Sequence, residues 1–167
     1  MLSNIKKNLN ISVHEKNRGI AEANRQNLFK KGIFTLNIIG SPGCGKTSLL
    51  ERTVTDFQHP FAVIVGDVKT ALDSDRIVSS GNKNAYAIET GGGCHLSAEM
   101  IKKKLAEMDL AGIDYLFIEN VGNLVCPSSF DLGENLKVAM LSIPEGDEKV
   151  RKYPALFVRA AAVIINK

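Results

Sequence analysis

The stretch GSPGCGKT, residues 40–47, places the tightest constraint on the fold of this chain. It matches the pattern G-x-x-x-x-G-K-[ST] in full, and it lies between a β-rich run (33–39) and a segment of helical character. In such a loop, glycines let successive backbone N–H groups point at phosphate oxygens, and the start of the following helix adds its positive dipole end. We therefore expect an α/β domain that binds a nucleotide.

Individual residues of this loop have distinct roles in that prediction. Lys46 is expected to reach the β- and γ-phosphates and to act in catalysis, and the Thr47 hydroxyl is expected to ligate Mg²⁺. The alternative is a glycine-rich turn that matches the pattern by chance, but both flanks have the required character. The residues expected to bind the nucleotide here are Gly40, Ser41, Pro42, Gly43, Cys44, Gly45, Lys46, Thr47 and Ser48.

Six apolar runs have the length and composition of buried strands, and helical segments separate most of them. This alternation is typical of a parallel sheet that helices cover on both faces. We predict a three-layer P-loop NTPase domain with a mostly parallel sheet over 33–167, preceded by an N-terminal helical extension over 1–32. The predicted strands are 33–39, 61–66, 85–90, 113–119, 137–143 and 161–166.

Two further helices are predicted from their apolar spacing and end signals. One spans 15–31 and is expected to end at Gly32. Its thin buried stripe is expected to consist of Ile20, Leu28 and Phe29. The other is expected to be capped by the Ser97 hydroxyl. Its buried face, at i, i+4 and i+7, is expected to consist of Ile101, Leu105 and Met108.

Composition excludes several classes of protein. The chain has 167 residues with 44% hydrophobic content, enough for one domain with a core. No apolar run approaches the roughly 20 residues of a membrane span, and the N-terminus lacks the apolar core of a signal peptide. Three cysteines far apart in sequence are a poor disulfide framework, so we expect a cytoplasmic protein. A net charge of +3 with dispersed lysine and arginine gives little support for nucleic-acid binding.

Carboxylates follow two of the predicted strands. Asp67 follows the second strand and Glu119 ends the fourth, so both are expected in the Mg²⁺ shell. Asp67 and Asp75 are also expected to act in catalysis by orienting the attacking water, with Asp73 in the same connection. Gly122 is expected to offer its N–H to the γ-phosphate. The alternatives are a solvated acidic turn, a helix cap at Asp73, and a strand-end acid that faces water.

The segment TGGGCHL holds Cys94 directly beside His95. Adjacent residues on a regular strand point to opposite faces, so both can approach one ion only from an irregular turn. The three preceding glycines permit such a turn. From the residues alone, two interpretations stay open: a metal site, and a loop with two incidental polar groups.

Five ordered motifs together resemble the HypB family of hydrogenase maturation GTPases, from about residue 15 to the last residue. They are GSPGCGKTSLLE, GDVKTALDSDRI, TGGGCHLSAEMI, IENVGNLVCPSSFDLGE and SIPEGDEKVRKYP. The resemblance implies a dimeric GTPase that uses GTP and Mg²⁺, releases GDP, and binds Ni²⁺ or Zn²⁺. It also implies delivery of nickel to the hydrogenase large subunit together with the accessory protein HypA.

The resemblance also implies specific ligands. The metal ligands of the family match Cys94, His95 and Cys126, and its guanine-reading Asn-Lys-x-Asp motif matches Asn166 and Lys167. Three metal ligands per chain are too few to close a tetrahedral site, so two chains would pool theirs or water would complete the shell. Cys126 lies seven residues after Glu119, in the loop expected to sense the γ-phosphate. Nucleotide state and metal geometry are therefore expected to be coupled.

The sequence departs from the family pattern at three places. It stops at Lys167, before the Asp that would pair with guanine, so we expect a truncated form of the domain. Cys44 stands where the family more often has serine, and it is expected to be a filler. Residues 1–32 hold one histidine, His14, and no cysteine, so a nickel site in the extension is not expected.

Other functions remain as alternatives at this point. Two are close: the urease-type nickel-delivery GTPase, and the GTPase chaperone of a cobalamin-dependent mutase. A P-loop kinase for a small metabolite and a binding module without turnover are more distant. In addition, Lys149, Arg151 and Lys152 would either reach a phosphate across a dimer interface or belong to a solvated charged helix.

Overall fold

The computed structural model describes residues 2–67 and 72–167 of the chain. Its centre is a six-stranded sheet in the order β3-β2-β4-β1-β5-β6, and every neighbouring pair is parallel. All six predicted strands are present, which confirms the α/β prediction. The strands are β1 (Phe34–Gly40), β2 (Phe61–Asp67), β3 (Ala85–Glu89), β4 (Tyr115–Glu119), β5 (Leu136–Ser142) and β6 (Ala162–Asn166).

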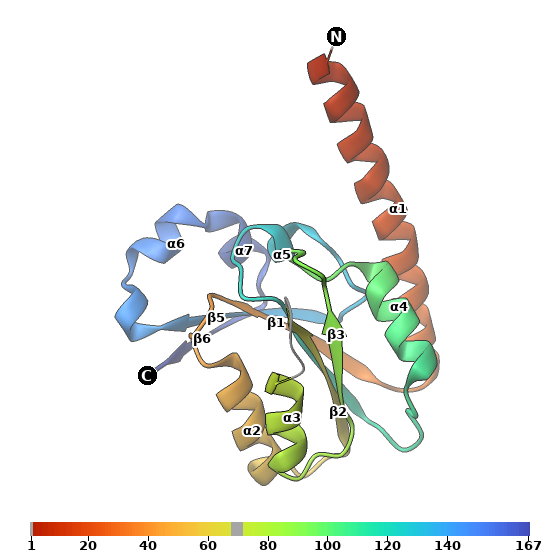
Figure 1. Cartoon of the computed structure of the whole chain (residues 1–167), viewed down its shortest axis with the longest axis vertical. Coiled ribbons are helices and arrows are strands. Elements are labelled where there is room, and N and C mark those ends of the chain that lie inside the picture. Colours follow the sequence, from red (N-terminus) through yellow and green to blue (C-terminus); the bar gives the residue numbers. More distant parts are fainter. Residues whose placement is uncertain (1, 68–71) are drawn as a thin grey trace.

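Helices cover both faces of this sheet (Figure 1). On β2, Ala62 and Ile64 pack into one apolar core, and the alternating Val63 and Val65 pack into the other. Helices α1 and α4 bury the first core, and α2 and α3 bury the second. The helices are α1 (Leu2–Lys30), α2 (Lys46–Asp56), α3 (Leu72–Ser79), α4 (Ala98–Glu107), α5 (Cys126–Ser129), the 3₁₀ helix η1 (Ile143–Glu145), α6 (Glu148–Lys152) and α7 (Pro154–Arg159).

Helix α4 matches its prediction. The Ser97 hydroxyl accepts a hydrogen bond from the Met100 N–H at 3.3 Å, which caps the helix. The predicted apolar face, Ile101, Leu105 and Met108, is buried. Within the part of the chain that the structure describes, no helix is both long and apolar enough to cross a membrane.

Helix α1 corrects the sequence prediction in two ways. It begins at Leu2, well before residue 15, and it projects beyond the body of the domain (Figure 1). Its buried stripe is also different, because the Phe29 side chain is 79% exposed. Leu28 and Phe29 are adjacent, so they point about 100° apart and cannot share a narrow stripe. The residues buried at helical spacing are Asn17, Ala21, Asn24 and Leu28.

The segment after β2 contains a helix. A polar connection was expected there, with a short helix capped by Asp73 as an alternative, and the structure has helix α3, with Asp73 and Asp75 in its first turn. The helix packs because Ile77 is fully buried in the same core as α2. Helix α3 has eight residues, several of them charged, and Ile77 is its one buried apolar residue. Such a sequence has little apolar periodicity, so the helix was not the main expectation.

Gly133 permits the close approach of α1 to the loop before β5. Its φ of +97° is unfavourable for other residues, and an added Cβ would lie 2.7 Å from the Ala21 carbonyl oxygen. Gly112 has a similar φ of +71° with nothing within 4 Å, so it is a matched control. We expect Gly133→Ala to lower the free energy of unfolding by about 1–3 kcal/mol more than Gly112→Ala, because only the former overpacks. Urea unfolding measures the free energy of unfolding of both variants. Equal losses would show that α1 does not pack closely against this loop.

Candidate functional site

The phosphate loop opens onto a cavity of about 370 Å³ at the carboxyl edge of the sheet. Strand β1 ends at Gly40 and helix α2 begins at Lys46, so the loop has the predicted strand–loop–helix context. The end of β2 and the loop after β4 supply the opposite wall. The lining residues are Pro42, Gly43, Gly45, Lys46, Thr47, Ser48, Gly66, Asp67, Asp73, Arg76, Glu119, Asn120, Val121, Gly122 and Lys167.

Lys46 is buried inside this loop. Its Nζ donates hydrogen bonds to the carbonyl oxygens of Gly40 (3.3 Å) and Ser41 (3.2 Å). These bonds are long, and a phosphate oxygen is a stronger acceptor for an ammonium group than a backbone carbonyl. The loop therefore holds a preformed positive charge in the place where the pattern requires one.

Glu119 and Thr47 form the floor of the cavity. The Thr47 hydroxyl donates to Glu119 Oε1 at 2.9 Å, and Glu119 is 4% exposed. Its Oε2 is buried without a hydrogen-bond partner among the described residues. An orphaned carboxylate oxygen beside a hydroxyl is a donor set that fits Mg²⁺, which prefers hard oxygen ligands. Burial raises the pKa of the Glu119 carboxyl to about 7, although the Lys46 charge and the Thr47 hydrogen bond lower it.

This raised pKa predicts a pH dependence of stability in the nucleotide-free protein. The ordinary pKa of 4.5 applies to the unfolded chain and about 7 to the folded one. Glu119 therefore contributes on the order of 3 kcal/mol to the free energy of unfolding below pH 4.5. This contribution is lost as the pH rises through 7. We expect Glu119→Gln, which stays neutral, to lack this loss. Urea unfolding of both proteins from pH 4 to 8 measures it, and parallel curves would contradict the prediction.

Other residues predicted to act on nucleotide occupy different places. Asp67 and Gly122 line the cavity, as expected of groups that face phosphate. Asp75 is exposed on α3 and is not among the lining residues, so its catalytic role stays a prediction. Asp73 and Arg76 line the cavity instead, and Arg76 pairs with Glu51 (2.8 Å) and Asp73 (3.2 Å). Arg76 was not predicted to line the cavity, because its position there depends on the formation of helix α3.

Cys44 and the last two residues lie against the same loop. The Cys44 thiol is fully buried in the core, and burial raises its pKa, which suits the expected filler. Asn166 Nδ2 donates to the Cys44 carbonyl (2.9 Å), and Lys167 Nζ donates to the Gly43 carbonyl (2.6 Å). The two residues predicted to read guanine thus contact the phosphate loop directly. Base recognition by these two residues stays a prediction.

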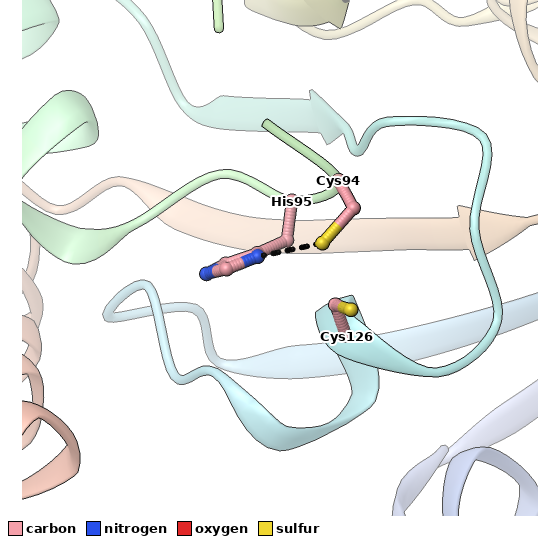
Figure 2. A group of neighbouring side chains, drawn as sticks. All are labelled: Cys94, His95 and Cys126. Carbon is pink, nitrogen blue, oxygen red and sulfur yellow. Dashed lines mark hydrogen bonds between the residues drawn. The ribbon is translucent and has the colours of Figure 1, made fainter. Parts of the chain in front are cut away.

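A second candidate site joins two segments that are distant in sequence. The ligand atoms of Cys94, His95 and Cys126 all lie within 4.8 Å of one another (Figure 2). We refer to these three residues as the metal triad. Cys94 Sγ is 3.5 Å from His95 Nδ1. The positive φ values of Gly91 (+63°) and Gly92 (+100°) form the irregular turn that lets adjacent residues converge.

The surroundings of the triad suit a soft or borderline metal ion. Burial lowers the pKa of the His95 imidazole, which favours the neutral form that ligates metals. Its ring packs on Phe130, with ring centroids 3.9 Å apart. A hydrogen bond with the Cys94 side chain raises the pKa of the Cys126 thiol, and burial and charge repulsion from Cys94 raise it further. A bound cation would favour the thiolate instead. Two sulfurs and one imidazole are ligands typical of Zn²⁺ or Ni²⁺ sites, and they leave a coordination position open.

One buried side chain connects the triad with the cavity. Asn120 lines the cavity beside Glu119, and its Oδ1 accepts a hydrogen bond from the Leu96 N–H at 3.2 Å. Leu96 directly follows His95. Asn120 Nδ2 is held in turn by Asn37 Oδ1 at 3.1 Å. Asn120 was not predicted as a site residue; its one signal in the sequence is an amide side chain that directly follows a buried strand.

The charged segment near the C-terminus forms α6, which has no buried residue. Lys152 pairs with Glu148 at 2.8 Å, and Lys149 pairs with Glu145 at 3.8 Å. These pairs agree with the solvated-helix alternative. Neither Lys149 nor Arg151 nor Lys152 is among the residues that line the cavity.

Known proteins resemble this chain over most of its length. The CobW/HypB/UreG nucleotide-binding domain model matches residues 34–167. Over 151 residues the chain is 46% identical to the hydrogenase/urease maturation factor HypB of Helicobacter hepaticus, covering 88% of this chain and 62% of that protein. It is 46% identical over 159 residues to the hydrogenase maturation factor HypB of Escherichia coli K12, covering 94% and 54%. The chain therefore spans little more than half the length of these curated relatives.

A solved structure shares the fold at similar identity. The crystal structure of HypB from Helicobacter pylori in complex with nickel superimposes with a TM-score of 0.85 at 45% identity. The match covers 90% of this chain and 71% of that one.

Proposed function

The chain belongs to the HypB branch of the CobW/HypB/UreG family, and from that premise we propose that it is the GTP-binding and metal-binding part of a nickel metallochaperone. It would bind and hydrolyse GTP, and it would carry Ni²⁺ for the assembly of [NiFe]-hydrogenase. The observation that carries the proposal is the convergence of Cys94, His95 and Cys126 within 4.8 Å, in the same domain as a complete phosphate loop.

The roles proposed in GTP hydrolysis follow from the geometry of the cavity. Lys46 would neutralise the β- and γ-phosphates, and Thr47 and Glu119, already joined by a hydrogen bond, would hold Mg²⁺. Bound Mg²⁺ supplies charge neutralisation on the phosphates. Asp67 orients water, with Asp75 of α3 as a further candidate, and Gly122 offers its N–H to the γ-phosphate. Asn166 and Lys167, which bond to carbonyls of the phosphate loop, would read the guanine base.

We propose that the nucleotide state controls the metal triad through Asn120. The side chain of Asn120 bonds to the backbone beside His95, and its own backbone lies next to Glu119. A shift of the loop after β4 on GTP binding would therefore move the Cys94–His95 turn relative to Cys126. Zn²⁺ suits the same ligands, so the affinity of the triad alone does not select nickel.

Partners and compartment are proposals of the same kind. Three ligands per chain leave room for ligands from a second copy, which supports a homodimer. HypA and the hydrogenase large subunit are the proposed nickel donor or acceptor partners, and the cytoplasm is the proposed compartment. The names of the relatives support the link to hydrogenase maturation.

Calorimetric titration with GTP and, separately, ATP in the presence of Mg²⁺ tests the nucleotide half of the proposal. We expect tighter binding of GTP. Nickel affinity is then measured in the GDP state and with a GTP analogue that is not hydrolysed. Failure to bind either nucleotide would overturn the GTPase proposal, and equal nickel affinity in the two states would overturn the coupling through Asn120.

Nickel delivery to urease is a second candidate, because the Helicobacter hepaticus relative is a hydrogenase/urease maturation factor. Pull-down of purified hydrogenase large subunit and of urease apoprotein separates the two. Family membership argues against the small-metabolite kinase, which would have no use for the metal triad.

A further inference from the structure

Helix α1 joins the two chain segments that carry the metal ligands, and we propose that Asn17 and Asn24 are positioning residues for the metal triad. The inference rests on the proposed nickel binding of that triad. Neither asparagine is a ligand; both lie on a helix from which no metal role was expected.

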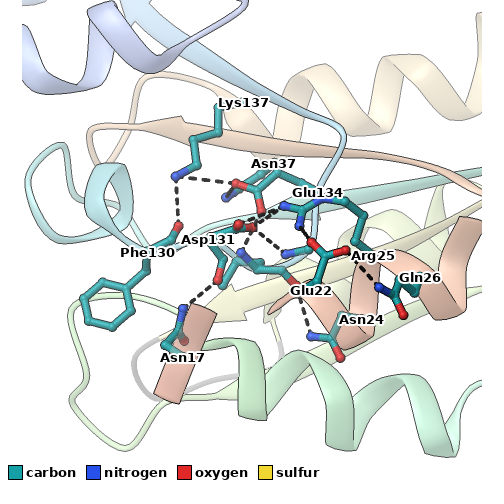
Figure 3. Close-up of polar contacts among 12 residues, drawn as sticks. Asn17, Glu22, Asn24, Arg25, Gln26, Asn37, Phe130, Asp131, Glu134 and Lys137 are labelled. Atoms are coloured by element: carbon teal, nitrogen blue, oxygen red, sulfur yellow. Dashed lines mark hydrogen bonds and ion pairs between the residues drawn. The ribbon is translucent and has the colours of Figure 1, made fainter. Parts of the chain in front are cut away.

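The hydrogen bonds of the two asparagines bridge the two segments. Figure 3 shows Asn17 and Asn24 on the side that faces the segment of Asp131. Asn17 Oδ1 accepts from the Ala98 N–H at 2.9 Å, and Asn17 Nδ2 donates to the Asp131 carbonyl at 2.7 Å. Asn24 Nδ2 donates to the carbonyls of Ala98 (2.9 Å) and Leu132 (3.0 Å). Ala98 lies three residues after His95, and the 131–132 segment follows the short helix that begins with Cys126.

Burial shows why asparagine occupies these positions. Asn24 is 3% exposed and Asn17 is 9% exposed, within a stripe where an amphipathic helix would ordinarily place apolar residues. A buried amide costs free energy unless it is hydrogen-bonded. Three of the four hydrogen bonds pair an amide with a backbone group that regular structure leaves open. The Ala98 N–H is in the first turn of α4, and the 131–132 carbonyls belong to an irregular segment.

Two further contacts attach the same segment to α1. Arg25 Nη2 lies 2.8 Å from both carboxylate oxygens of Asp131. The Phe130 ring contacts two histidine rings. Its centroid lies 4.8 Å from that of His14 on α1 and 3.9 Å from that of His95 in the triad. Helix α1 thus sets the distance between the Cys94–His95 turn and the segment of Cys126. That distance decides whether three ligand atoms reach one ion.

The test compares Asn17→Ala and Asn24→Ala with the wild-type chain and with Leu28→Ala. Leu28 is 2% exposed on the same helix and packs in the apolar core, so its truncation weakens α1 without removing a bridge. Ni²⁺ affinity is measured by competition with a chromophoric chelator, and the thiolate-to-nickel absorption band reports ligand geometry. Melting temperature and GTP affinity are measured on the same samples.

We expect each asparagine variant to lose Ni²⁺ affinity by about 10–100-fold and to change the absorption band, with GTP affinity within twofold of wild type. Leu28→Ala should lower the melting temperature but keep the affinity and the band. Asn17→Gln, which retains an amide able to pair with the Ala98 N–H and the Asp131 carbonyl, should lose less than Asn17→Ala and serves if the alanine variant does not fold.

Unchanged Ni²⁺ affinity in the asparagine variants would overturn the inference and leave the proposed function intact. The inference would also be overturned if Leu28→Ala lost as much Ni²⁺ affinity as an asparagine variant of the same melting temperature. A general destabilisation of α1 would then explain the loss. A wild-type chain that binds no Ni²⁺ would overturn the metal half of the proposed function and the inference with it.

Discussion

Replacing Lys46 with alanine is expected to lower the affinity for GTP in Mg²⁺ by at least about 100-fold. Lys46 is 6% exposed, and among the described residues two loop carbonyls, at 3.2 and 3.3 Å, accept hydrogen bonds from its ammonium group. A hydrogen bond to a charged group contributes about 1.5–3 kcal/mol, and Lys46 is placed to make two of them to phosphate. Two lost bonds therefore amount to two or more factors of ten.

Calorimetric titration measures this loss, with Lys83→Ala as the matched control. Lys83 is an exposed lysine that does not line the cavity, so its removal changes the net charge equally. We expect the control to bind GTP like the wild type. Circular dichroism of Lys46→Ala verifies that the variant is folded. Wild-type affinity in a folded Lys46→Ala protein would remove the phosphate loop from the proposed mechanism.

Replacing Cys126 with alanine is expected to lower Ni²⁺ affinity by at least about 100-fold. The change removes one of two sulfurs from a set of three ligands. Changing a residue that only supports a metal ligand lowers metal affinity by about 10–100-fold. Loss of a ligand itself should reach or exceed the upper end of that range. The thiolate-to-nickel absorption should weaken in proportion.

The third cysteine of the chain provides the control for this experiment. Cys44→Ala removes a thiol that is buried beneath the phosphate loop, away from the triad. We expect it to retain wild-type Ni²⁺ affinity in chelator competition. A Cys126→Ala protein that binds Ni²⁺ as tightly as Cys44→Ala would show that the ion is held elsewhere.

Much of the fold could be predicted from short-range patterns. The six strands were predicted from apolar runs, and the Ser97 cap was predicted from a single hydroxyl before an apolar face. Helix α3 was expected only as an alternative, and the short helices α5 and α7 were not predicted. They bury few residues each, so their sequences have almost no periodicity, and tertiary contacts stabilise them.

Local patterns likewise predicted some residues of the candidate sites and not others. Residues of the phosphate loop act through backbone geometry within one strand–loop–helix unit, so their positions followed from the pattern. The Cys94–His95 turn also followed from its glycines. The approach of Cys126 did not follow from spacing and came only from the resemblance to a family. Asp75 shows the converse, because a residue close in sequence to Asp67 lies on the exposed side of α3.

The sequence by itself determined the phosphate loop, the parallel strands that alternate with helices, and the soft ligands available for a metal. These depend on local backbone freedom, on apolar spacing and on side-chain chemistry. Only the tertiary structure decided that Asn120 connects the two sites and that Asn17 and Asn24 bridge the segments of the triad. An asparagine has no preferred partner until packing excludes water and leaves particular backbone groups within its reach.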